Sequence, residues 1–158
     1  DAVGKGGMGK KMRHDIGDVR ITMKAVLRAA RQIVNAELAA LNLTGAEGDI
    51  LFHLLSENGG LSQEELSGRL DIGKAAVSRT VQVLESAGYV HRERLASDAR
   101  TYRVTVTDAA KIVGSQIGQA YESVYKAALR DIGASDFEHL AVLLDQVHAN
   151  LNARAANR

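Results

Sequence analysis

The chain has 158 residues, 46% of them apolar, carries a formal net charge of +1 and contains no proline and no cysteine, so it is long enough for one domain with a real core. The absence of cysteine excludes disulfides, thiolate metal sites and cysteine nucleophiles, and the absence of proline favours uninterrupted helices. No apolar run approaches the roughly 20 residues that a membrane span requires and no signal segment opens the chain, which predicts a cytoplasmic protein without membrane contact.

The chain is predicted to begin with a tail and one long helix. Residues 1–13 are rich in glycine and lysine and hold almost no side chain able to enter a core, so we expect a flexible basic tail. From about Asp15 to Leu41 apolar residues recur in steps of mostly three and four, which predicts a helix with one narrow apolar stripe. The opposite side is basic, a pattern typical of a seam between subunits. Residues 14–42 are therefore predicted to be an N-terminal dimerisation helix.

Two shorter helices are predicted next, each with its own start signal. Thr44 can cap a helix that stops at the Asn-Gly-Gly sequence of residues 58–60. Ser62, followed three residues later by Glu65, is a capping box that opens a helix over residues 63–70.

The following segment completes a helix-turn-helix. Residues 71–73 form a short turn, and a helix over residues 74–87 stops at Gly88, which can take a left-handed backbone. Two helices joined by a tight glycine-bearing turn are the signature of this motif. Alternating β-branched and aromatic residues then predict a hairpin of residues 89–95 and 101–107, joined by the five residues between them.

Two long helices are predicted to end the chain. Thr107 caps one that reaches about Arg130, and Ser135 with Glu138 opens the other. The last helix carries an apolar stripe made of Phe137, Leu140, Leu144, Val147 and Leu151. The predicted fold class is mainly α with a small β-hairpin.

The predicted helix of residues 74–87 has two chemically different faces when it is projected at 100° per residue. The face expected to pack inward consists of Val77, Val81 and Leu84. The face expected to point outward consists of Ala75, Ser78, Arg79, Gln82 and Ser86. The outward face offers a cation for phosphate or guanine, an amide for adenine, a hydroxyl and a small methyl for thymine. We interpret it as a DNA-reading face; the alternative is an ordinary solvated face.

The predicted hairpin is rich in arginine and strengthens this interpretation. Between Arg69 and Arg103 the chain has seven basic and four acidic residues, so the low total charge conceals a basic region. The five-residue connection lets an arginine stand off the tip, where a narrow minor groove of DNA focuses negative potential and attracts it. Asp98 is expected to orient a nearby arginine, Arg79 or Arg100, by a charge-assisted bond.

Catalytic and metal-binding patterns do not rise above background. The five histidines contain no pair at i and i+4 and no adjacent carboxylates with ligand spacing. No Ser/His/Asp arrangement or pair of carboxylates stands out. We therefore predict no metal site, no cofactor and no enzymatic activity.

At this point the sequence resembles the MarR family of bacterial transcription regulators. Three stretches carry the resemblance: LTGAEGDILFHLL (43–55), GGLSQEELSGRLDIGKAAVSRTVQVLESAGYVHRE (59–93) and SDARTYRVTVTDAAKIV (97–113). The flanking helices also match the family's layout, although the wing lacks proline. The resemblance implies a winged helix-turn-helix DNA-binding domain in residues 43–107 and C-terminal dimerisation helices in residues 108–158.

The resemblance also implies a homodimer that places one helix of each subunit in a major groove of double-stranded DNA and each wing in a minor groove. The residues predicted at the DNA interface are Ser62, Gln63, Lys74, Ala75, Ser78, Arg79, Gln82, Arg92, Arg94, Asp98 and Arg100. The resemblance associates the region of His53 with an effector pocket, and Met23, Val26, Tyr89 and Tyr121 are expected to line the same space.

The predicted function is a dimeric, sequence-specific repressor of a pseudo-palindromic operator, relieved by a small aromatic or anionic effector. Two-fold symmetry alone predicts half-sites about one helical turn apart. Two alternatives stay open at this stage. One is a winged-helix module for protein association, and the other is a metal-responsive regulator.

Overall fold

The computed structural model describes residues 15–157, apart from the side chain of Ala99, so the predicted tail lies outside the described residues. The elements in chain order are α1 (Ile16–Leu38), the 3-10 turn η1 (Ala39–Leu41), α2 (Gly45–Leu55), β1 (Leu61–Ser62), α3 (Gln63–Leu70), α4 (Lys74–Ser86), β2 (Val90–Leu95), β3 (Asp98–Val106), α5 (Asp108–Ala128) and α6 (Ala134–Ala156). The predicted class, mainly α with a small β-hairpin, is confirmed.

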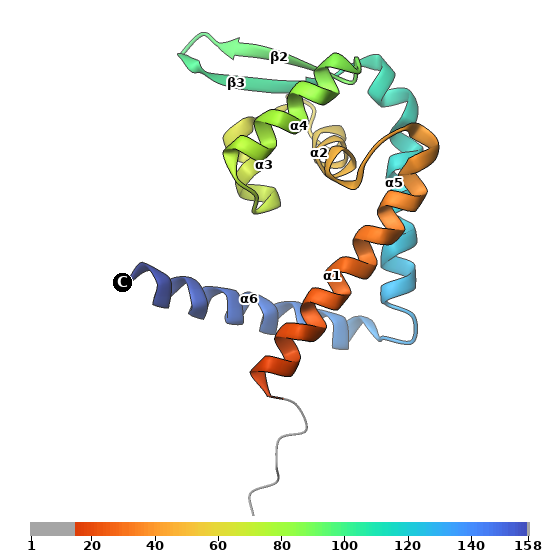
Figure 1. The fold of residues 1–158 in the computed structure, drawn as a ribbon, viewed down its shortest axis with the longest axis vertical. Coiled ribbons are helices and arrows are strands. Elements are labelled where there is room, and N and C mark those ends of the chain that lie inside the picture. Colours follow the sequence, from red (N-terminus) through yellow and green to blue (C-terminus); the bar gives the residue numbers. More distant parts are fainter. Residues whose placement is uncertain (1–14, 158) are drawn as a thin grey trace, which may run out of the picture.

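The elements divide into a head and three long helices (Figure 1). The head consists of α2, α3, α4 and the three strands. Helices α1 and α5 descend from it in contact with each other, and α6 turns away after α5 and projects from the rest of the chain. Within residues 15–157 no helix has the length and apolarity needed to cross a membrane.

Capping boxes begin three of the helices. Asp15, Thr44 and Ser62 each accept a hydrogen bond from the backbone three residues on, where an acidic side chain returns one to the cap backbone. This reciprocal pairing satisfies two amide donors that a helix start otherwise leaves free. The predicted starts at Thr44 and Ser62 are confirmed. The predicted start of the last helix, with Ser135 as its cap, is wrong by two residues, because Gly133 is the N-cap of α6 and no side chain caps it.

The sheet is small and antiparallel, with strand order β1-β3-β2. The predicted hairpin is confirmed, but its connection is tighter than the predicted five residues. Leu95 pairs with Asp98, so the turn contains two residues, and the register shifts between Arg94 and Leu95. Strand β1 was not predicted; Leu61 pairs with Val104, and this joins the start of α3 to the hairpin.

The core lies mainly within the head, and α5 adds the buried side chains of Ala110, Ile117 and Ala120. Val77, Val81 and Leu84 are fully buried, as predicted for the inward face of α4. Helix α1 contributes only two buried residues, Val34 and Leu38, near its C-terminal end, and α6 contributes none. The head therefore has a closed core, whereas most of α1 and all of α6 are not buried by this chain.

We predict that Gly60 is required for the fold. Its φ is 72°, and a Cβ at this position would overlap the carbonyl oxygen of Val104, because β1 and β3 pair directly beside it. We expect Gly60→Ala to lower the free energy of unfolding by at least about 2 kcal/mol, since a left-handed backbone and a backbone clash add. Chemical denaturation measures this change.

Gly68 in α3 is the matched control, because a Cβ there would meet nothing within 4 Å. Gly68→Ala replaces a helical glycine and should raise stability by about 0.5 to 1 kcal/mol. Equal effects of the two substitutions would contradict the role of Gly60.

Candidate nucleic-acid interface

The turn between α3 and α4 fixes the outward direction of α4. Asp71 ends α3 in a left-handed conformation at φ 50°, and its backbone amide donates to the Ser67 carbonyl. The Ser67 hydroxyl donates to the carbonyl oxygen of Ile72 at 2.6 Å, and the Ile72 amide donates to the Ser67 carbonyl at 3.2 Å. The buried valines of α4 anchor its inner side. The opposite face of α4 therefore points away from the core.

The outward face of α4 is open to solvent over most of its length. Ala75, Arg79, Gln82 and Ser86 are exposed, and Ser78 is half-buried. Arg79 forms no ion pair with any residue in the described range 15–157. The face thus offers one cation, one amide and small side chains, a combination that fits the edges of base pairs in a major groove.

The start of α3 is held tightly. Ser62 is 9% exposed; its amide donates to Glu65 Oε2 at 2.7 Å, and its hydroxyl accepts from the Glu65 amide at 3.1 Å. These bonds, helped by nearby Arg103 and Arg69, lower the pKa of Glu65. The Nε2 atom of Gln63 is buried and has no hydrogen-bond partner among the described residues. Ser62 is therefore engaged as a cap, and Gln63 has an unused donor.

At the wing tip, Asp98 shapes the backbone. Its Oδ1 accepts from the Arg100 amide at 3.0 Å and its Oδ2 accepts from the Thr101 hydroxyl at 2.9 Å. These bonds lower the pKa of Asp98, the amide of Arg100 contributing most. The prediction that Asp98 orients the side chain of Arg79 or Arg100 is wrong, because the carboxylate is satisfied by the turn itself. The exposed side chain of Arg100 stands beside that turn.

Two residues that the sequence analysis did not single out organise the base of the wing. Glu85 of α4 accepts from Arg92 of β2, with Nη2 to Oε2 at 2.7 Å, and this pairing lowers the pKa of Glu85. The Tyr102 ring lies 5.3 Å from the Arg92 guanidinium and 5.4 Å from that of Arg94, whose Nε donates to the Tyr102 hydroxyl at 3.1 Å. The pairing of Arg94 with Tyr102 in the hairpin is the feature from which the role of Tyr102 could have been predicted.

Several cations of the basic region are neutralised within the head. Arg69 pairs with Glu57 at 2.6 Å, Lys74 with Glu64 at 3.3 Å, and Arg103 donates to the carbonyl oxygens of Gly59 and Gly60. Arg69, Arg92 and Arg103 are thus engaged in the fold, whereas the Lys74 pair is exposed to solvent at both ends. Within the described residues, the cations of this region without an acidic partner are Arg79, Arg94, Arg100 and Arg103, of which Arg103 is held by backbone carbonyls.

The five residues associated with an effector do not meet at one place. Met23 and Val26 line an apolar cleft of about 490 Å³ between α1 and α6. The Tyr121 ring of α5 lies 4.4 Å from the Phe52 ring between centroids, and the His53 ring meets Phe52 edge to face at 5.9 Å. Tyr89 is half-buried at the end of α4. No three His, Asp or Glu side chains in residues 15–157 could hold a metal ion together.

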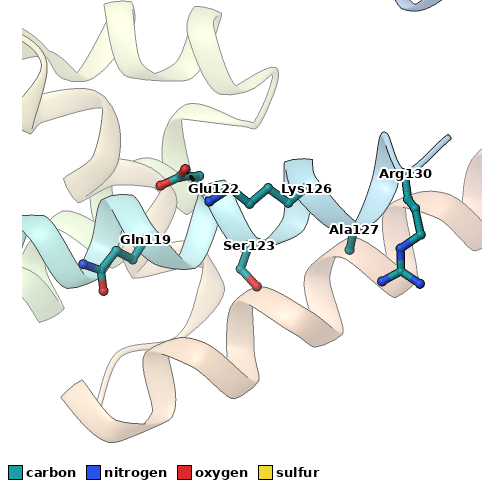
Figure 2. Close-up of a pocket in the computed structure, with 6 residues that line it drawn as sticks. All are labelled: Gln119, Glu122, Ser123, Lys126, Ala127 and Arg130. Atoms are coloured by element: carbon teal, nitrogen blue, oxygen red, sulfur yellow. Dashed lines mark ion pairs between the residues drawn. The ribbon is translucent and has the colours of Figure 1, made fainter. Parts of the chain in front are cut away.

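A second, polar depression of about 630 Å³ runs along the C-terminal half of α5 (Figure 2). Ser123 points from α5 toward α1, where its hydroxyl donates to Glu37 at 3.4 Å. Lys126 pairs with Glu122 one turn earlier, at 2.7 Å. The residues that line this depression belong to α5, apart from Arg130 just beyond the helix. The depression therefore lies away from the outward face of α4.

Comparison with known proteins gives one family match and many similar structures. Residues 41–101 match the model of the MarR family. The crystal structure of the transcriptional regulator SlyA has a TM-score of 0.77 at 23% identity, covering 87% of this chain and 96% of that chain. A MarR protein from Peptoclostridium difficile has a TM-score of 0.78 at 21% identity, covering 96% of this chain and 97% of that chain. The S. aureus MepR protein, solved in complex with DNA, has a TM-score of 0.76 at 16% identity, covering 83% and 96%.

Proposed function

Because the chain belongs to the MarR family through its winged-helix core, we propose that it is a dimeric, sequence-specific DNA-binding regulator of transcription. It acts as a repressor at a pseudo-palindromic operator, and a small aromatic or anionic effector relieves it. The observation that carries the proposal is the pairing of an exposed face on α4 with a wing on which Arg94 and Arg100 have no acidic partner in the described chain. The MepR structure in complex with DNA supports the same use of the fold.

In this proposal, α4 enters the major groove. Arg79 and Gln82 are exposed one turn apart, so they can reach neighbouring base pairs, while Ala75 and Ser78 are small enough to let the helix approach closely. Ser62, Gln63 and Lys74 lie at the ends of α3 and α4 that flank this face and contact phosphates. Gln63 supports this role, because its buried Nε2 has an unused donor that a phosphate oxygen can accept once the side chain turns outward.

The wing binds the neighbouring minor groove. Arg100 reaches into the groove from a turn that Asp98 holds in place. Arg94, which is held by Tyr102, contacts the sugar-phosphate backbone of the DNA. Arg92 belongs to the interface as the link between wing and α4, since Glu85 occupies its guanidinium. The minor groove concentrates negative potential where it is narrow, so a free arginine at the tip adds affinity and a preference for A·T-rich sequence.

A dimer is supported by the apolar surface that one chain leaves exposed. Exposed large apolar side chains number six on α1 and seven on α6. Isolated helices are marginal in water, and tertiary packing normally supplies their stability. A second copy that covers both helices closes the apolar cleft between them and buries these residues, which is the isologous contact of a two-fold dimer.

Charge also favours contact between α1 and α6 of two copies. Residues 131–153 contain four acidic residues and no lysine or arginine, whereas α1 carries exposed Arg20, Lys24 and Arg28. Opposite charges beside an apolar seam select the partner and its orientation. The two heads then stand on opposite sides of the two-fold axis, with their α4 helices spaced for half-sites about one helical turn apart.

The effector part of the proposal rests on the family resemblance. Of the five residues associated with it, Tyr121 and His53 both contact the Phe52 ring, and Met23 and Val26 line the cleft between α1 and α6. Both places lie on the dimer helices or where they meet the head. A ligand bound there shifts the separation of the heads only by its differential affinity for the two arrangements.

The first prediction separates reading from anchoring at the DNA interface. Arg100→Ala should weaken binding to all sequences and flatten the salt dependence by about one unit per lost phosphate contact. Gln82→Ala should instead relax discrimination at one base position, at a cost of about 1 to 3 kcal/mol. Gel shifts on the DNA flanking the gene, at several salt concentrations, measure both effects.

Arg130→Ala is the control for charge, because it removes one exposed arginine far from α4. Operator affinity unchanged in the Arg100 variant would remove the wing from the proposal. Binding to random duplex without a steep salt dependence would favour a module for protein association instead.

The second prediction concerns the dimer. Leu144→Glu places a charge in the apolar cleft between α1 and α6, and we expect it to shift the protein to monomers in sedimentation velocity runs. Val83→Glu is the matched control, because Val83 is an exposed apolar residue of α4 in the head. A Leu144 variant that sediments like the unmodified dimer would show that this surface is not the interface.

The third prediction tests the effector. Benzoate and related aromatic carboxylates should lower operator affinity by about 5- to 150-fold at saturation, the usual range for coupling between two sites. Acetate serves as the control for a carboxylate without a ring. If the aromatic acids leave operator affinity unchanged, and the affinity differs between zinc and a chelator, the effector is a metal ion and not an organic acid.

A further inference from the structure

A polar cluster joins three helices where the head meets α1 and α5. Arg31 of α1 donates from Nη2 to Asp49 Oδ2 at 2.6 Å. The other oxygen of Asp49, on α2, accepts a short hydrogen bond from the Tyr121 hydroxyl of α5. The Asp49 carboxylate of the head therefore binds both α1 and α5. We call Arg31, Asp49 and Tyr121 the junction cluster.

The surrounding packing brings these helices unusually close. A Cβ at Gly45 would overlap Arg31 and the Asn35 side chain, and Asn35 Oδ1 accepts from the Gly45 amide at 2.7 Å. A Cβ at Gly48 would overlap Leu38 of α1. Two glycines one turn apart thus remove the side chains that would hold α2 away from its neighbours.

Tyr121 is fixed from two sides. Its ring stacks on Phe52 of α2 at 4.4 Å between centroids, and its hydroxyl donates to Asp49. Burial raises the pKa of Tyr121, and the Asp49 carboxylate raises it further, so the phenol stays protonated and continues to donate. The ring and the hydroxyl of Tyr121 thus contact α2 at two separate points.

The energy of this cluster is better suited to orientation than to stability. Arg31 and Asp49 side chains are 46% and 24% exposed, and ion pairs with such exposure contribute little to the free energy of unfolding. Apolar contacts are non-directional and tolerate small rotations, whereas charge-assisted hydrogen bonds have preferred lengths and angles. The cluster therefore constrains the angle of the head more than it stabilises the fold.

We propose that the Arg31–Asp49–Tyr121 cluster sets the angle of each head on the dimer helices and thereby the separation of the two α4 helices, with Asp49 as the positioning residue. Over a lever arm of about 20 Å, within the roughly 30 Å span of a small domain, a rotation of about 10° moves α4 by about 3.5 Å. That displacement is close to the rise of one base pair. The cluster thus selects the half-site spacing of the operator. This inference rests on the proposed dimeric DNA reader.

The first experiment measures the separation of the heads without DNA. The chain has no cysteine, so Ser86→Cys gives one spin-labelling site per subunit, on exposed α4. Pulsed electron paramagnetic resonance on the full-length dimer then reports the distance between the two α4 helices. We expect Tyr121→Phe and Asp49→Asn to shift or broaden this distance by about 3 Å or more, roughly one base-pair rise.

Two controls match the chemistry of these variants. Tyr125→Phe removes an exposed phenol one turn along the same helix, and Glu57→Gln weakens an ion pair of the same 2.6 Å length that lies within the head. Both should leave the distance unchanged. Thermal unfolding confirms that each variant is folded, and Tyr121→Phe, which removes a single oxygen, keeps the test available if Asp49→Asn does not fold.

The second experiment uses operators whose half-sites are moved apart by one or two base pairs. The unmodified protein should favour one spacing, and the junction variants should lose about fivefold of that preference, a typical size for residues that modulate coupling. Folded dimeric variants that keep both the distance and the spacing preference would overturn the inference and leave the proposed function intact. A labelled protein that gives no distance between subunits would overturn the proposed dimer, and the inference with it.

Discussion

The arrangement of this protein depends on apolar surface that a single chain cannot bury. The head closes its own core around α2, α4 and β3, but α6 has no buried residue and α1 has two, both next to the head. Water does not support a long helix with an open apolar face, because helix formation gains most of its stability from packing. The head is buried together with the adjoining parts of α1 and α5, whereas the rest of α1 and all of α6 leave apolar side chains exposed. In the proposed function, DNA binding and dimerisation thus fall to separate parts of one short chain.

Most of the head followed from local signals in the sequence. The capping boxes at Thr44 and Ser62 placed two helix starts correctly, because each depends on residues only three positions apart. The inward face of α4 followed from its period. The length of the wing turn did not follow, because Asp98 folds the chain back through bonds to its own neighbours and begins β3 there. The cap of α6 was misplaced because Ser135 and Glu138 carry a plausible local signal that the helix does not use.

Features that depend on distant residues were out of reach of the sequence. Strand β1 has only two residues and forms because it pairs with β3. Its residue Leu61 pairs with Val104, which lies 43 positions further along the chain. Asp49 and Tyr121 are 72 positions apart, so no spacing rule connects them. Of the candidate interface, the sequence identified the outward residues of α4 and the wing arginines, and the structure described how they are held. It added Glu85 and Tyr102, which organise the wing without belonging to the exposed face.

Strand β1 ties the two halves of the head into one cooperative unit. Ser62 is at once the last residue of β1 and the N-cap of α3, so the ladder with β3 ends where the helix begins. Fraying of the hairpin from its base therefore removes the support of the first turn of α3. In hydrogen exchange, we therefore expect the amides of the wing base and of the first turn of α3 to open together. The hairpin is only a small antiparallel ribbon, but β1 joins its base to the helices of the head.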